Sequence, residues 1–168
     1  MISYFKTLNL QSNKMKHLIL FGIMWLCGLM TVVAQNVPQV IPALQQWKPA
    51  KGKMVLPESG KVIISSDEEG ALKQSAEILV QDLKEMFGWN YRVVIGKQEK
   101  GAVFLTLSKP DKTLGDEGYR MDVRNGVTIE APTAKGVFWG TRTLLQMIHN
   151  QPEGLMRGQA TDFPLYPN

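Results

Sequence analysis

The stretch that decides the fold reads GYRMDVRNGVTIEA and runs from Gly118 to Ala131. Apolar and polar side chains alternate on both sides of Asn125-Gly126, which is the pattern of two half-buried strands. Asn-Gly is the typical two-residue connection of a hairpin, because a type I′ turn needs positive φ at both central residues. We therefore predict that residues 119–123 and 127–131 pair antiparallel around a type I′ turn at Asn125-Gly126.

A helix is predicted directly after this hairpin, from about Ala134 to His149. Gly136 and Gly140 are four residues apart, so they share one side of the helix and allow its backbone to approach a sheet closely. Each glycine costs about 1 kcal/mol of helix propensity relative to alanine, which indicates that close packing compensates for it. The expected buried stripe consists of Val137, Thr141, Leu144, Leu145 and Ile148.

An earlier helix is predicted to start near Ser66 and to end at Phe87. Ser66 and Glu69 have the spacing of a capping box, and Gly88 is the residue expected just past a helix end. Its apolar face would carry Leu72, Ala76, Leu79, Leu83 and Phe87, which recur at steps of three and four residues.

Short strands are predicted before and after the first helix. They cover residues 53–56, 61–65, 91–95 and 103–107. The whole pattern predicts an α+β fold, in which a mostly antiparallel sheet carries two helices packed on one face.

The N-terminal residues 1–34 have the pattern of a signal peptide. Lys14 and Lys16 precede an apolar run from His17 to Val33, which ends in small residues at Ala34. A membrane anchor is the alternative, but the run is short for a span and no basic cluster follows it. We expect cleavage after Ala34 and export to the periplasm or the extracellular space; Met15 is an alternative start.

The composition limits the classes of function. The three lysines Lys6, Lys14 and Lys16 precede Ala34 and no acid does, so most of the net charge of +4 belongs to the leader. The mature region therefore lacks the basic excess of a nucleic-acid-binding protein. The single cysteine, Cys27, lies in the apolar run, and Leu26 before it argues against lipidation. Disulfides and thiolate metal sites are excluded from the mature region.

No catalytic, cofactor-binding or metal-ligating residue is assigned from motifs. The sequence has no metalloprotease, phosphate-binding-loop, nucleophile-elbow or Cys-x-x-Cys motif. His149 is interpreted as a favourable residue at a helix C-terminus. Asp67-Glu68-Glu69 and Asp116-Glu117 are interpreted as structural, because nothing beside them would raise the pKa of a carboxyl group.

Three tryptophans are candidates for stacking on sugar rings. We expect Trp139 to pack between helix and sheet instead, and Trp89 to cover the end of the first helix. Trp47 lies in the proline-containing segment 35–50, which is predicted to be an extended lead-in. For Trp47 a sugar platform remains an alternative, and a contact with another domain is the preferred interpretation.

The order of these motifs resembles the N-terminal domain of family 20 glycoside hydrolases, the β-N-acetylhexosaminidases. The resemblance rests on Ile41-Pro42, on Gly118-Tyr119 with its hairpin, on residues 136–146, and on Asp162-Phe163-Pro164. In that family Asp-x-Pro leads into the first strand of a catalytic barrel, although Leu165 stands here where a basic residue is frequent. The resemblance implies a non-catalytic α+β domain at 51–152, followed at 153–168 by a linker and the first barrel residues.

The resemblance also implies a function. The chain would be the front part of an exported enzyme that removes terminal N-acetylhexosamine units from glycans, with its catalytic Asp-Glu pair beyond Asn168. Its partner would be the barrel, it would need no cofactor, and alone it would be inactive. Two alternatives are a free-standing carbohydrate-binding module, which exposed aromatic residues along one sheet face would favour, and a protein-interaction domain.

Overall fold

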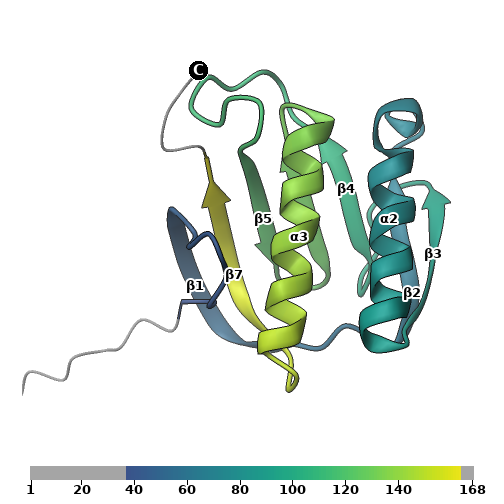
Figure 1. The fold of residues 1–168 in the computed structure, drawn as a ribbon, viewed down its shortest axis with the longest axis vertical. Coiled ribbons are helices and arrows are strands. Elements are labelled where there is room, and N and C mark those ends of the chain that lie inside the picture. Colours follow the sequence, from purple (N-terminus) through teal and green to yellow (C-terminus); the bar gives the residue numbers. More distant parts are fainter. Residues whose placement is uncertain (1–36, 164–168) are drawn as a thin grey trace, which may run out of the picture. The chain divides into compact units, whose positions relative to one another are not determined.

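The structure is a computed structural model that describes residues 37–163. The predicted signal peptide and residues 164–168 lie outside this range. Figure 1 shows the elements, which in chain order are β1 (Gln46–Met54), β2 (Ser59–Ile64), α2 (Glu69–Phe87), β3 (Asn90–Ile95), β4 (Val103–Leu107), β5 (Tyr119–Val123), β6 (Val127–Ala131), α3 (Ala134–Asn150) and β7 (Leu155–Asp162).

Seven strands form one sheet in the order β1-β7-β5-β6-β4-β2-β3. Strands β1, β7, β5 and β6 pair antiparallel, whereas β6, β4, β2 and β3 pair parallel. Both helices lie side by side on the same face of this sheet (Figure 1). The predicted α+β class with two helices on one face is confirmed. The other face of the sheet, called the open face below, carries no helix among the described residues.

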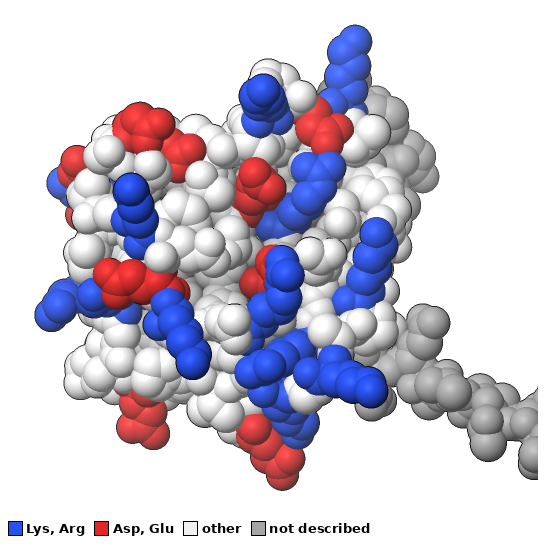
Figure 2. All heavy atoms as spheres, turned by 180° about the vertical axis from the view of Figure 1, so that it is seen from behind, with Lys and Arg blue, Asp and Glu red and all other residues white. Residues whose placement is uncertain are grey.

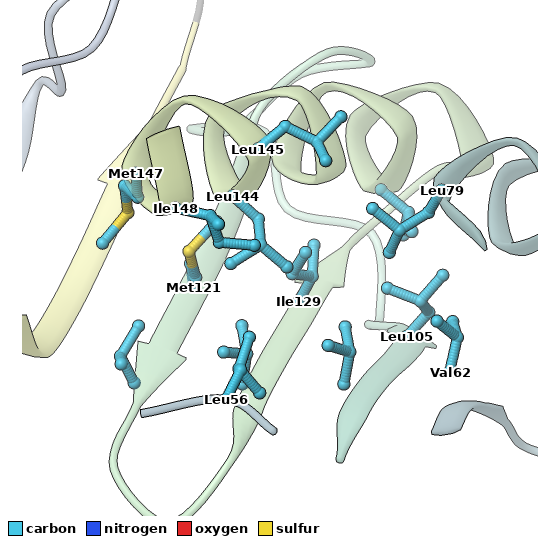
Figure 3. Packing of buried hydrophobic residues seen from close by; sticks show 14 of the residues in the cluster. Leu56, Val62, Leu79, Leu105, Met121, Ile129, Leu144, Leu145, Met147 and Ile148 are labelled. Atoms are coloured by element: carbon cyan, nitrogen blue, oxygen red, sulfur yellow. The ribbon is translucent and has the colours of Figure 1, made fainter. Parts of the chain in front are cut away.

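The core lies between the helices and the sheet. Leu79 of α2 and Leu144 of α3 are fully buried against strand residues (Figure 3). The strand residues that meet them include Val62, Leu105, Met121 and Ile129, each at most 1% exposed.

The hairpin predicted from the sequence is present, but its turn differs. Strands β5 and β6 pair antiparallel, whereas neither Asn125 nor Gly126 has positive φ, so the prediction of a type I′ turn is wrong. The glycine is needed for another reason: a Cβ atom at Gly126 would lie 2.7 Å from the carbonyl oxygen of Ala102. The N–H of Val127 donates to that same oxygen at 3.0 Å. The turn is therefore shaped by its contact with the segment before β4.

Helix α2 ends as predicted and begins differently. Gly88 adopts φ 73°, and its N–H donates to the carbonyl oxygen of Lys84 at 3.0 Å. The helix starts at Glu69, and no side chain caps its N-terminus, so the predicted capping box of Ser66 and Glu69 is wrong. The Glu68 carboxylate, which stands at the capping position, turns away instead and accepts the N–H of Leu107 at 3.0 Å.

Helix α3 approaches the sheet closely, as its glycines predict. A Cβ atom at Gly136 would lie 2.4 Å from the carbonyl oxygen of Gly118, and one at Gly140 would lie 2.4 Å from Cγ2 of Ile129. Real Cβ atoms do not come so near, so any larger residue would push helix and sheet apart. Thr133 caps the helix by accepting the N–H of Gly136 at 3.1 Å.

The sequence did not predict the full extents of β1 and β7, which are neighbours at one edge of the sheet. Strand β1 takes up the end of the predicted lead-in, and β7 takes up most of the segment predicted as a linker after 152. Strand β7 lies between β1 and β5 and pairs with both. The domain's sheet therefore continues to Asp162.

Candidate interdomain surface

The two acidic clusters serve the fold. Glu68 accepts the Thr106 hydroxyl at 3.2 Å and joins the start of α2 to the end of β4. Glu117 pairs with Lys135 of α3, and the carbonyl oxygen of Asp116 accepts the Thr133 hydroxyl. Glu68, Asp116 and Glu117 thus make contacts within the domain.

Among residues 37–163, no three His, Cys, Asp or Glu side chains lie together in a way that could hold a metal ion. In the same part of the chain, no helix has the length and apolar character needed to cross a bilayer. His149 stands exposed in the last turn of α3.

The tryptophans have three different environments. Trp89 packs against Phe87 with ring centroids 5.5 Å apart and covers the end of α2 as predicted. Trp47 is half-buried and packs against β7, because a Cβ atom at Gly158 would lie 2.5 Å from its ring; the contact with another domain stays a prediction. Trp139 is 44% exposed, and its predicted place between helix and sheet is wrong. The side of α3 that faces the sheet is taken by Gly136 and Gly140 instead.

Tyr119 and Asp162, which belong to the sequence motifs named above, lie close together at the end of β7. The Tyr119 hydroxyl hydrogen-bonds the Thr143 hydroxyl at 2.6 Å, so β5 is tied to α3 in the buried core. The Asp162 carboxylate at the end of β7 accepts the N–H of Phe163 at 3.1 Å and also interacts with Tyr119. This cluster fixes the last described residues against the core.

The cluster of Tyr119, Thr143 and Asp162 leads to a prediction of how stability depends on pH. Burial raises the pKa of the Asp162 carboxyl above 3.8, and hydrogen bonds from Phe163 and Tyr119 oppose this only in part. The folded chain therefore holds this proton more tightly, which stabilises it at low pH, and that contribution is lost as the pH rises through the raised pKa. Urea unfolding at a series of pH values should show Asp162→Asn gaining stability relative to the unmodified chain as the pH rises above about 4.

Asp111 provides the comparison of opposite sign. Hydrogen bonds from Thr113, together with Arg120, hold the pKa of its carboxyl well below 3.8. The carboxylate of Asp111 therefore stabilises the folded chain above about pH 4, and this contribution is lost as the pH falls through the lowered pKa. Asp111→Asn should lose stability relative to the unmodified chain at neutral pH, and the difference should shrink on acidification. If both variants showed the same pH trend, the assignment for Asp162 would be wrong.

A second contact, which the sequence did not reveal, ties the segment before β1 to helix α3. The Gln146 side chain accepts the N–H of Ile41 at 2.7 Å and donates to its carbonyl oxygen at 2.9 Å. Asn150 donates to the carbonyl oxygen of Gln39 at 2.7 Å. The residues 37–43 are thereby held beside α3.

These residues form an apolar groove with the helices, called the helix-side groove below. Its apolar walls come from residues 37–43, from Met86 of α2 and from Leu145 of α3, and Arg142 and Gln146 add polar atoms. Ile41 is 85% exposed and Met86 is 53% exposed. Exposed apolar side chains gathered in one place indicate an interaction surface.

Trp139 extends the same surface along α3. It lies three residues before Arg142 and seven before Gln146, spacings that place all three on one side of a helix. Arg142 pairs with Asp82 of α2 and lies over the Phe138 ring at 4.7 Å from its centroid. This ion pair joins the two helices, and Arg142 connects the groove to Trp139 along α3.

The family model described as glycosyl hydrolase family 20, domain 2, matches residues 37–163, which is the whole described range. The chain belongs to glycoside hydrolase family 20. The predicted resemblance is thereby confirmed at the level of the family. A lacto-N-biosidase of Bifidobacterium bifidum is 30% identical over 131 residues, which are 77% of this chain and 11% of that protein.

Solved structures of family 20 enzymes contain the same fold. The N-acetyl-β-hexosaminidase of Streptomyces plicatus, in complex with Thio-NAglucal, is 27% identical, with a TM-score of 0.63 over 80% of this chain and 28% of that one. The β-N-acetylhexosaminidase of Streptomyces coelicolor is 28% identical, with a TM-score of 0.60 over 74% of this chain and 26% of that one. The chain spans about a tenth of the curated relative and about a quarter of the solved enzymes.

Proposed function

We propose that this chain is the non-catalytic N-terminal domain of an exported β-N-acetylhexosaminidase, and that it supports the catalytic barrel. The parent enzyme would remove terminal N-acetylhexosamine units from glycans. The family 20 relatives are hexosaminidases and a lacto-N-biosidase, in which the matching region covers only a minor part of the protein. The helix-side groove and its extension at Trp139 support a role beside another domain.

That surface carries the proposal because it gathers exposed apolar side chains in one place. Ile41, Met86 and Trp139 are each more than 40% exposed, and all three belong to the helix-side groove or its extension along α3. Interdomain contacts bury surfaces of this kind, and large aromatic and methionine side chains are enriched at interfaces. We therefore place the barrel against the helices.

The gene downstream of the Asn168 codon tests the first part of the proposal. We expect a reading frame, direct or frameshifted, for a barrel domain with an Asp-Glu pair. The purified 168-residue chain should release no product from a chromogenic N-acetylglucosaminide. Hydrolysis by this chain alone, or unrelated sequence downstream, would contradict the proposal.

Trp139→Ala tests the docking in the parent enzyme. A buried interface tryptophan is often worth 2 kcal/mol or more, so thermal unfolding of the two domains should separate in this variant. In the 168-residue chain the same change should cost less, about 1 kcal/mol, because the side chain is 44% exposed there.

Ile95→Ala is the matched control. Ile95 is 40% exposed, but it ends β3 at the sheet edge, away from the groove. We expect it to leave the coupling between the domains unchanged. Equal effects of the two variants would place the interface elsewhere.

A further inference from the structure

The open face of the sheet carries polar side chains in two rows that cross four strands. In the first row, Gln46 of β1 pairs with Thr161, Thr161 with Arg120, and Arg120 with Glu130 of β6. In the second row, Lys48 of β1 pairs with Gln159, Gln159 with Asp122, and Asp122 with Thr128 of β6. With a strand spacing of about 4.8 Å, each row is about 14 Å long.

These rows form the floor of a depression of about 640 Å³. Its walls are the loop residues 98–100 and the turn at 124–126. Figure 2 shows the molecule from this side, with Lys and Arg scattered among Asp and Glu. The lining combines four basic residues (Lys48, Lys100, Arg120 and Arg124) with three acidic ones (Glu99, Asp122 and Glu130), and the remainder is mostly amide and hydroxyl groups.

Several of these groups are held in place by one another. Asp122 accepts Nε of Arg124 at 2.7 Å and the amide of Gln159 at 3.2 Å. The Gln98 amide donates to the Thr128 hydroxyl at 2.6 Å, which fixes the wall loop against the floor. A preorganised set of donors and acceptors loses little entropy when a ligand binds.

Two charged ends of the rows have no such contact. Among the described residues, the side chains of Lys48 and Glu130 take part in no hydrogen bond or ion pair. They stand on the outer strands of the four, one at each side of the depression. A ligand that lies across the strands can reach a donor at one side and an acceptor at the other.

We propose that this depression binds a neutral glycan segment that contains N-acetylhexosamine. Sugar hydroxyl and acetamido groups both donate and accept hydrogen bonds, as the lining does. The near balance of acidic and basic residues disfavours a polyanion. The proposal rests on the proposed function in one respect: a barrel docked on the helices leaves the open face exposed, where it can hold a substrate chain near the enzyme.

The test is a titration of the 168-residue chain with chitotetraose, followed residue by residue in two-dimensional ¹H–¹⁵N NMR spectra. We expect shifts at the side-chain amides of Gln98 and Gln159 and in β5 to β7, with little change in α2. Replacing both floor charges, by Lys48→Ala with Glu130→Gln, should weaken binding about tenfold, which corresponds to about 1.4 kcal/mol.

Matched controls separate a specific effect from a loss of charge. Lys109→Ala with Glu77→Gln removes the same groups from exposed positions outside the depression and should leave binding unchanged. No shifts at 10 mM chitotetraose, shifts confined to the helix-side groove, or preference for a sulfated oligosaccharide would each overturn the proposal. The docking of the barrel is tested separately by Trp139→Ala.

Discussion

Tyr119→Ala is expected to lower the free energy of unfolding by about 3–5 kcal/mol, the usual cost of removing a large aromatic side chain from a core. Tyr119 is 1% exposed and is among the largest fully buried side chains of the domain. The change would leave a cavity below α3 and would also leave the Thr143 hydroxyl without its partner. Urea denaturation monitored by circular dichroism measures the loss.

Tyr119→Phe separates the two parts of this effect. It keeps the ring and removes the hydroxyl that bonds Thr143, so we expect a loss of about 1–3 kcal/mol for the unpaired buried group. A loss as large as that of the alanine variant would show that the hydroxyl, and not the packing of the ring, dominates.

Gly140→Ala should destabilise the domain although alanine is the better helix former. The new Cβ atom would lie 2.4 Å from Cγ2 of Ile129 and 3.2 Å from Cδ2 of Tyr119. Helix and sheet would have to separate, and overpacking of this kind costs about 1–3 kcal/mol. Thermal and urea unfolding should both report the loss.

Gly70→Ala is the same chemical change in the first turn of α2. A Cβ atom there meets nothing within 4 Å, so the gain in helix propensity, up to about 1 kcal/mol, should appear unopposed. The two variants should therefore differ in sign. If Gly140→Ala were also stabilising, helix α3 would not be held against the sheet as closely as the structure shows.

Gly140 belongs to the part of the fold that the sequence predicted well. The hairpin, the two helices and the close approach at Gly136 and Gly140 follow from local patterns, because each of these elements has one buried face. The signal at Gly88 was equally local, since a left-handed residue ends the helix there. The turn at Asn125-Gly126 was misjudged because its shape depends on the distant residue Ala102.

Strands β1 and β7 escaped prediction for a related reason. β1 is almost entirely exposed and contains Pro49 and Gly52, and β7 mixes four polar residues with small and apolar ones. Neither has a clear alternation of apolar and polar residues. They form strands because they pair with neighbouring strands, which a local sequence pattern does not show. The site was also only partly predictable: the helix-side groove needs residues 37–43 beside α3, and the depression needs four strands in register.

The order of strands has a consequence for synthesis of the chain. β1 has a single neighbour in the sheet, β7, which is the last strand in chain order among the described residues. Gln46 meets Thr161 only after more than a hundred intervening residues have been made, so β1 waits unpaired while the hairpin and both helices can already assemble. Because such distant pairing is slow, the nascent domain stays open at this edge until Asp162 has emerged. A ribosome that stalls before β7 would therefore present an incomplete sheet to proteases and chaperones.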